Sequence, residues 1–176
     1  MAVKRWFVLG LLMVVMAVLV SACGRGTAYT ANWTSVSVAQ GTFVTTAGSV
    51  SEQAYKKRCL HIKVDYDKGT DFDLYKGKDV YFKGPVYEAS LTDSSSSSEI
   101  PAGLGYVSLG LGPDVQHGGA GMSIDILWPG RVPGVPDDTT GIPDGRTVEV
   151  WGECQGGVSP GDIDRVLVRA RYITVH

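Results

Sequence analysis

Carboxylates at alternate positions form the part of this chain that comes nearest to a metal-binding pattern. Between residues 65 and 73, an aspartate or a glycine stands at every second position: Asp65, Asp67, Gly69, Asp71 and Asp73. A helix–loop–helix calcium site also needs glycine at its sixth position and glutamate at its twelfth, where this chain has Thr70 and Lys76. We therefore expect a solvated connecting loop here and no bound metal.

The histidines and the glycine pairs do not form a known catalytic pattern. His61, His117 and His176 have no second histidine or cysteine at the spacing of zinc ligands. The chain has no Gly-x-Ser-x-Gly motif. The glycine pairs in residues 103–105 and 110–112 lack the helix start that a phosphate-binding loop requires. The sequence therefore predicts no catalytic residue, no metal and no cofactor, and a protein that is not an enzyme.

The N-terminal residues show a pattern of targeting and processing that ends at a cysteine. Lys4 and Arg5 precede an almost unbroken apolar run over residues 6–20, and small residues stand just before Cys23. This order is typical of a secretory signal peptide. The segment Val-Ser-Ala-Cys, which ends at Cys23, resembles the lipobox of bacterial lipoproteins. In that family the cysteine thiol receives a diacylglyceryl group, the chain is cleaved before the cysteine, and the new amine is often acylated, for instance with palmitate.

We therefore expect residues 1–22 to be a lipoprotein signal peptide and Cys23 to carry a lipid that holds the protein outside the cytoplasm. The anchoring membrane would be the cell membrane or the outer membrane of a bacterium. A plain secretory signal and a retained anchor are the alternatives, although the apolar run is shorter than the roughly 20 residues of a spanning helix. The formal charge of −2 becomes −4 when the two cations of the signal are lost. That balance argues against a protein that finds nucleic acid by bulk electrostatics.

Residues 23–47 are rich in glycine, threonine, serine and alanine, so we expect the lipidated cysteine to continue into a flexible tether. Two further cysteines, Cys59 and Cys154, remain in the mature chain. An even number of thiols outside the cytoplasm favours a disulfide. Buried free thiols are the alternative, because free cysteine is commonly buried.

Alternating apolar residues predict five strands in the remaining domain, which covers residues 48–176. The expected strands are 79–87, 106–111, 122–128, 147–154 and 163–175. A capping box that begins at Ser49 predicts a short helix over residues 50–57. Gly84 and Pro85 predict a bend in the first strand, and a change of apolar phase after Tyr172 predicts a bulge in the last.

The connection over residues 129–145 is too rich in proline for an ordinary helix. Five strands with a bent first strand and a long connection between the third and the fourth are typical of an all-β, five-stranded Greek-key barrel of the OB-fold kind. A β-sandwich is the competing architecture, but it usually needs about seven strands.

The alternation also predicts which side chains point away from the core. Five aromatic or basic residues share the outward phase and form a candidate binding face: Tyr81, Lys83, Tyr87, Tyr106 and Trp151. OB folds use aromatic rings for stacking on such a face and basic groups for phosphate. Arg169 and Arg171 are expected nearby. The acidic residues Asp125, Glu149 and Glu153 share the phase, however, and mixed charge suits a protein or sugar better than a polyanion. Alternatively, the aromatic rings pack beneath the N-terminal segment or the long loops.

Four segments of the chain also carry a pattern known from other proteins. The matching residues are Tyr55, Lys56 and Cys59; Tyr75, Gly77, Lys78, Val80, Phe82, Gly84 and Val86; Gly145, Val148, Val150 and Gly152; and Ala170, Tyr172, Ile173 and Val175. The pattern resembles that of bacterial lipoproteins with a tRNA-anti-like OB-fold domain, a largely uncharacterised family. The resemblance spans roughly residues 55–176 and implies the fold. It implies little about activity, because one fold hosts many functions. Cys154 is not part of the family's pattern.

Taken together, the residues predict a membrane-anchored extracytoplasmic lipoprotein with a non-catalytic OB-fold module. Its expected partner is an envelope protein or a glycan. An OB fold that binds single-stranded nucleic acid is an alternative, and an accessory subunit of an envelope enzyme is another.

Overall fold

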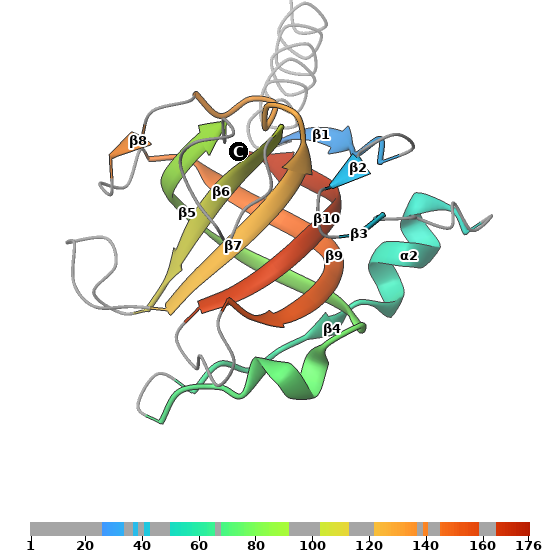
Figure 1. Ribbon diagram of the computed structural model, residues 1–176, viewed down its shortest axis with the longest axis vertical. Helices are drawn as coiled ribbons and strands as arrows, with labels where there is room; N and C mark the ends of the chain where they lie inside the picture. The colour runs from blue at the N-terminus through green and yellow to red at the C-terminus, as the bar shows by residue number, and fades with distance from the viewer. Residues whose placement is uncertain are drawn as a thin grey trace, which may run out of the picture.

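A computed structural model of the chain describes residues 26–33, 37–38, 41–42, 50–65, 68–91, 103–112, 122–136, 139–140, 145–158 and 165–176. The predicted signal peptide, residues 1–22, and the predicted lipidation site, Cys23, lie outside the described residues. Figure 1 shows strands wound into a barrel, with a short helix beside it.

Five strands close the barrel. They are β5 (Asp79–Leu91), β6 (Leu104–Leu111), β7 (Met122–Pro129), β9 (Thr147–Gly157) and β10 (Arg165–Val175). β5, β6 and β7 follow one another as antiparallel neighbours, and β7 pairs in parallel with β10. β10 pairs with β9, and β9 returns to β5, so the sheet has no edge at this point. The prediction of an all-β, five-stranded OB-like barrel is confirmed.

The long strand β5 belongs to both halves of the barrel. Its first seven residues pair with β9, as far as Pro85 opposite Thr147. From Val86 onward it pairs with β6, and the register shifts between Val86 and Glu88. The bend predicted at Gly84 and Pro85 therefore lies where the strand changes partner. The bulge predicted near Tyr172 is also present, as a register shift between Ala170 and Tyr172.

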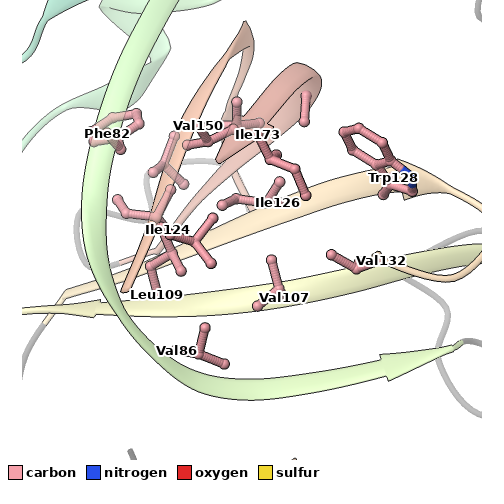
Figure 2. Close-up of a cluster of buried hydrophobic side chains, with 14 of the residues drawn as sticks. Phe82, Val86, Val107, Leu109, Ile124, Ile126, Trp128, Val132, Val150 and Ile173 are labelled. Atoms are coloured by element: carbon pink, nitrogen blue, oxygen red, sulfur yellow. The ribbon is translucent and has the colours of Figure 1, made fainter. Parts of the chain in front are cut away.

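The interior of the barrel is filled by the apolar side chains that point inward from each strand. Figure 2 shows side chains from all five strands meeting there, including Phe82 from β5, Val107 from β6, Ile126 from β7, Val150 from β9 and Ile173 from β10. These side chains are almost completely buried. Each large one contributes about 1.5–3 kcal/mol through the apolar surface that folding removes from water. The burial alternates strictly along β9, which is why its sequence predicted the strand so well.

Short elements surround the barrel. They are α2 (Glu52–Arg58), β4 (Leu60–His61), η1 (Phe72–Tyr75), β8 (Thr139–Thr140) and the small β2–β3 pair (Ser37–Val38 and Gly41–Thr42). The cap of α2 is Ser51 and not the predicted Ser49, because the Ser51 hydroxyl accepts the Ala54 amide at 3.4 Å. Within the described part of the chain, no helix is long and apolar enough to cross a membrane.

Part of the predicted tether belongs to the folded domain. The strand β1 (Thr27–Thr30) pairs antiparallel with the last residues of β10, from Thr27 opposite Val175 onward. The Trp33 side chain is buried, and its indole N–H donates to the Ala170 carbonyl at 2.7 Å. The prediction that residues 23–47 form one flexible segment is therefore wrong for residues 27–33. Residues 27–30 show no alternation of apolar and polar side chains, and pairing with the edge of β10 makes them a strand.

Candidate functional site

The structure divides the predicted binding face into two parts. Tyr81, Lys83 and Trp151 come together on the outside of β5 and β9, where Tyr81 stands opposite Trp151. Tyr106 lies apart from them, on β6. Tyr87 is half-buried at the register shift of β5, where the strand turns from the first part to the second.

Glu149 organises the first part. The Tyr81 hydroxyl donates to its Oε1 at 2.8 Å, the Lys83 ammonium lies 3.4 Å from the same oxygen, and the His176 ring nitrogen lies 3.0 Å from Oε2. Burial alone would raise the pKa of Glu149, but the hydrogen bonds from His176 and Tyr81 and the charge of Lys83 lower it. Burial, and then the bond to Glu149, raise the pKa of Tyr81. The carboxylate is thus ionised, and it holds these neighbours in place.

Helix α2 covers the aromatic rings of this part. Tyr55 of the helix packs on Tyr172 with ring centroids 5.6 Å apart, and Tyr81 and Trp151 pack against this buried cluster. The Lys56 ammonium lies 3.8 Å from the centre of the Trp151 ring, which is a cation–π contact. These rings are therefore covered by a helix of the domain itself, whereas the alternative prediction placed them beneath the N-terminal segment or the long loops. Here Trp151 is a contact surface for the protein's own helix.

The two thiols that were considered for a disulfide are both free and buried. The Cys154 thiol points into the barrel and approaches the Phe72 carbonyl at 3.8 Å, whereas Cys59 lies outside the barrel in the cluster under α2. Leu60 pairs with Val80, and Val80 pairs with Gly152. The backbones that carry the two cysteines are therefore two strand spacings apart, about 9–10 Å. A disulfide needs Cα atoms about 4.4–6.8 Å apart, so this fold does not accommodate the bond.

The second part of the outer face lies on β6, β7, the second half of β5 and the start of β10. We call it the Asp125 face, and its residues are Glu88, Tyr106, Ser108, Ser123, Asp125 and Arg165. Of these, the sequence prediction included Tyr106 as a binding residue and Asp125 as an acidic neighbour. The other four were missed. A signal was present: Ser123 and Asp125 alternate with the apolar Met122, Ile124 and Ile126, and a carboxylate in such a strand needs a partner wherever neighbouring side chains bury it.

The Asp125 carboxylate is almost completely buried, with 1% of its side chain exposed. It accepts hydrogen bonds from the hydroxyls of Ser108 at 2.5 Å and Ser123 at 3.2 Å. Its other oxygen lies 2.6 Å from the guanidinium of Arg165, whose side chain is 46% exposed. A buried carboxylate is stable only when it is paired and hydrogen-bonded, and these three partners meet that requirement. The consequence is that Asp125 fixes the direction of an exposed guanidinium.

Tyr106 is held in the same way. Its hydroxyl donates to Glu88 Oε1 at 2.6 Å. Burial raises the pKa of Tyr106, the bond to Glu88 raises it further, and the charge of nearby Arg165 acts in the opposite direction. Tyr106 and Ser108 are two residues apart on β6 and so share its outer side, and Ser108 stands opposite Asp125 on β7. The two groups therefore lie on the same outer face. That surface offers an aromatic ring, a guanidinium and a carboxylate, each with a restrained orientation.

Two arginines elsewhere on the outer face are also matched by carboxylates, and a third lies over an aromatic ring. Arg169 lies 2.6 Å from Glu153, as its expected place near the face suggested, and Arg58 lies 2.7 Å from Asp79. The Arg171 guanidinium lies 4.7 Å from the centre of the Tyr55 ring. Paired charges produce little positive potential, and a polyanion needs such potential to bind.

The acidic segment around residues 65–73 uses its carboxylates on backbone amides. Asp65 accepts the Lys68 amide at 3.1 Å, Asp71 caps η1 through the Asp73 amide at 3.1 Å, and Asp73 accepts the Gly157 amide at 3.2 Å. Among the residues whose placement is described, no three side chains of histidine, cysteine, aspartate or glutamate gather in a way that could hold a metal ion. His117 and Asp67 fall outside the described ranges.

Comparison with protein-family models, with curated proteins and with solved structures finds no match for this chain.

Proposed function

We propose that this chain is a bacterial lipoprotein, anchored through Cys23, whose OB-like barrel binds an envelope protein or a glycan without catalysing a reaction. The binding role rests on the Asp125 face. There an exposed guanidinium and a half-buried tyrosine are each held by a carboxylate of the neighbouring strand, Arg165 of β10 by Asp125 of β7 and Tyr106 of β6 by Glu88 of β5. Restrained polar groups lose little conformational freedom when a ligand arrives, so more of the interaction energy appears as affinity.

The position of this face supports a ligand role. OB folds bind oligosaccharides and oligonucleotides over their second and third strands. Those strands are β6 and β7 in this barrel, and they carry Tyr106 and Asp125. The first part of the outer face is less suitable, because α2 lies on it.

The charges favour a glycan or a protein over nucleic acid. The Asp125 face has two carboxylates, Glu88 and Asp125, against one guanidinium. A phosphate backbone would be repelled by this balance, whereas sugar hydroxyls or a mixed protein surface can donate to a carboxylate and accept from a guanidinium. A base that stacked on Trp151 would also have to displace Lys56.

Site-specific photo-crosslinking in living cells tests the binding role. A photoreactive amino acid replaces Tyr106, and the matched control carries it at the exposed Glu52 on α2. We expect a discrete adduct from position 106 alone, and a weaker one when Arg165→Lys is added, because lysine keeps the charge but loses the planar fork. Equal adducts from both positions, or none from position 106 in a folded and anchored protein, would contradict the proposal.

Two further measurements separate the remaining alternatives. Binding of an oligonucleotide to the purified protein, with an affinity that falls steeply as salt rises, would replace our proposal with the nucleic-acid function. Cys23→Ser tests the anchor: we expect the acyl mass and the membrane association to be lost together. A protein that keeps its membrane association after this change is held by other means.

A further inference from the structure

The distance between the proposed lipid anchor and the folded barrel is very short. Only Gly24, Arg25 and Gly26 separate Cys23 from Thr27, the first residue of β1. Four residue steps span at most about 14 Å even when the chain is fully extended. A lipid on Cys23 would therefore hold the start of β1 within about 14 Å of the headgroup layer.

The start of β1 is fixed to the barrel. Thr27 pairs with Val175 and Thr30 with Tyr172, so four consecutive residues are locked to β10. Close packing reinforces the attachment: a Cβ placed on Gly26 would lie 2.6 Å from the His176 ring and 2.7 Å from the Val175 carbonyl. An anchor that pulls on residue 27 consequently pulls on the whole barrel.

One end of the barrel lies beside the start of β1. β5, β7 and β10 run in the same direction, and β6, β9 and β1 run against them. The ends of the first three strands and the starts of the other three therefore lie together. Figure 1 shows this end at the top, with the C-terminus, β1 and the tip of β5. Leu91, the last residue of β5, is 45% exposed there.

The opposite end carries η1. The Asp73 carboxylate of η1 accepts the amide of Gly157, which is the last residue of β9. Leu74 in the same element is 66% exposed. The 11 residues of β10 connect the two ends, and at about 3.3 Å per residue with a tilt of about 40° they cover roughly 25–30 Å along the barrel axis.

We propose that the end of the barrel formed by the start of β1, Leu91 and the C-terminus rests on the lipid surface, and that η1 faces away from it. This inference rests on the proposed lipidation of Cys23. It assigns the bilayer as the partner of one end of the barrel and leaves the side with the Asp125 face open to ligands. Charge does not decide the orientation. The basic residues Arg131 and Arg146 lie near the membrane end, but Asp137, Asp138 and Asp144 belong to the same connection in the sequence.

Quenching by headgroup-labelled lipids tests the orientation. The lipidated full-length mature protein is placed in vesicles whose lipid headgroups carry a nitroxide. One variant carries a fluorophore on Leu91→Cys, and the matched variant carries it on Leu74→Cys. The native thiols of Cys59 and Cys154 are buried, and mass spectrometry verifies that one label is present. We expect the label at position 91 to lose most of its fluorescence and the label at position 74 to keep it.

A longer linker provides the decisive control. Insertion of 20 Gly/Ser residues after Gly24 adds a coil about 25 Å in root-mean-square length, so the quenching at position 91 should fall sharply while the protein stays anchored. Three outcomes would overturn the proposed orientation. They are equal quenching at the two positions, stronger quenching at position 74, and quenching at position 91 that persists after the insertion. Absence of the acyl mass on Cys23 would overturn the inference in a different way, because the proposed anchor itself would then have failed.

Discussion

Removal of the Arg165 guanidinium should destabilise the barrel, because among the described residues it leaves the buried Asp125 carboxylate with the hydroxyls of Ser108 and Ser123 as its remaining partners. Arg165→Met keeps an unbranched apolar stem of similar length to that of arginine and deletes the charged guanidinium. Breaking a fully buried ion pair from one side costs about 3–5 kcal/mol. Arg165 is 46% exposed, so water can replace part of the lost interaction at that end. We therefore expect a loss of about 2 kcal/mol in the free energy of unfolding.

The same loss should appear as a decrease of about 4–8 °C in Tm for a domain of this size. The assay is chemical denaturation of Arg165→Met, Asp125→Asn and the double variant, evaluated as a double-mutant cycle. The double variant should be less destabilised than the two single effects predict together, because it no longer contains an unpaired charge.

Glu52→Gln is the comparison. Glu52 pairs with Lys56 at 2.8 Å, but 46% of its side chain is exposed. Loss of this surface pair and of the acidic group at the helix start should cost less than about 1 kcal/mol. A loss below about 0.5 kcal/mol for Arg165→Met, or strictly additive effects in the cycle, would refute the assignment of Asp125 as a buried charge that depends on Arg165.

Three further outcomes are expected. Gly152→Ala should destabilise the protein by about 3 kcal/mol or prevent folding, because a Cβ there would lie 2.3 Å from the Arg169 carbonyl oxygen. Gly77 has a φ of +77° and open space around it, so Gly77→Ala should cost only about 1–2 kcal/mol in the same denaturation assay. Burial raises the pKa of Cys59 from 9.0 to about 11, so its thiolate fraction at pH 8 should be about a hundredfold lower than for an ordinary thiol. Both cysteines should react slowly with a thiol reagent in the native state and quickly after unfolding without reductant. If the unfolded chain consumes no reagent, the two cysteines are joined in a disulfide and the assignment of free thiols is wrong. The folded-state pKa of Glu149 is lowered from its ordinary value of 4.5, so the ionised carboxylate stabilises the fold above pH 4.5 and this contribution disappears as the pH falls further. Glu149→Gln should therefore be less stable than the parent chain at pH 7, with a difference that shrinks in denaturation experiments below pH 4.5.

Local sequence order was sufficient to predict the barrel strands. In a strand, side chains alternate between two faces whatever the partner strand is, so Val148, Val150 and Gly152 revealed their common face without any knowledge of β10. The bend at Gly84 was predictable for a similar reason. In contrast, β1 carries no apolar alternation and becomes a strand by adding to an edge of β10.

The partners of the outward residues could not be predicted in the same way. Alternation placed Tyr81, Tyr106 and Trp151 outside the core, but it contains no information about what covers them. Helix α2 reaches Trp151 through Lys56, which is 95 positions away in the chain, and so turns a predicted ligand platform into an internal contact.

The sequence by itself determined the five barrel strands and the outward phase of their polar residues, because both depend on neighbours in the chain. It also carries the signal-like segment and Cys23, which are read as linear patterns. Only the tertiary structure decided that Arg165 meets Asp125 across 40 residues, that Cys59 and Cys154 lie on opposite sides of a sheet, and that β1 begins at one end of the barrel. Closure of the barrel brings distant strands together, and its register, which no local pattern encodes, selects the pairs that meet.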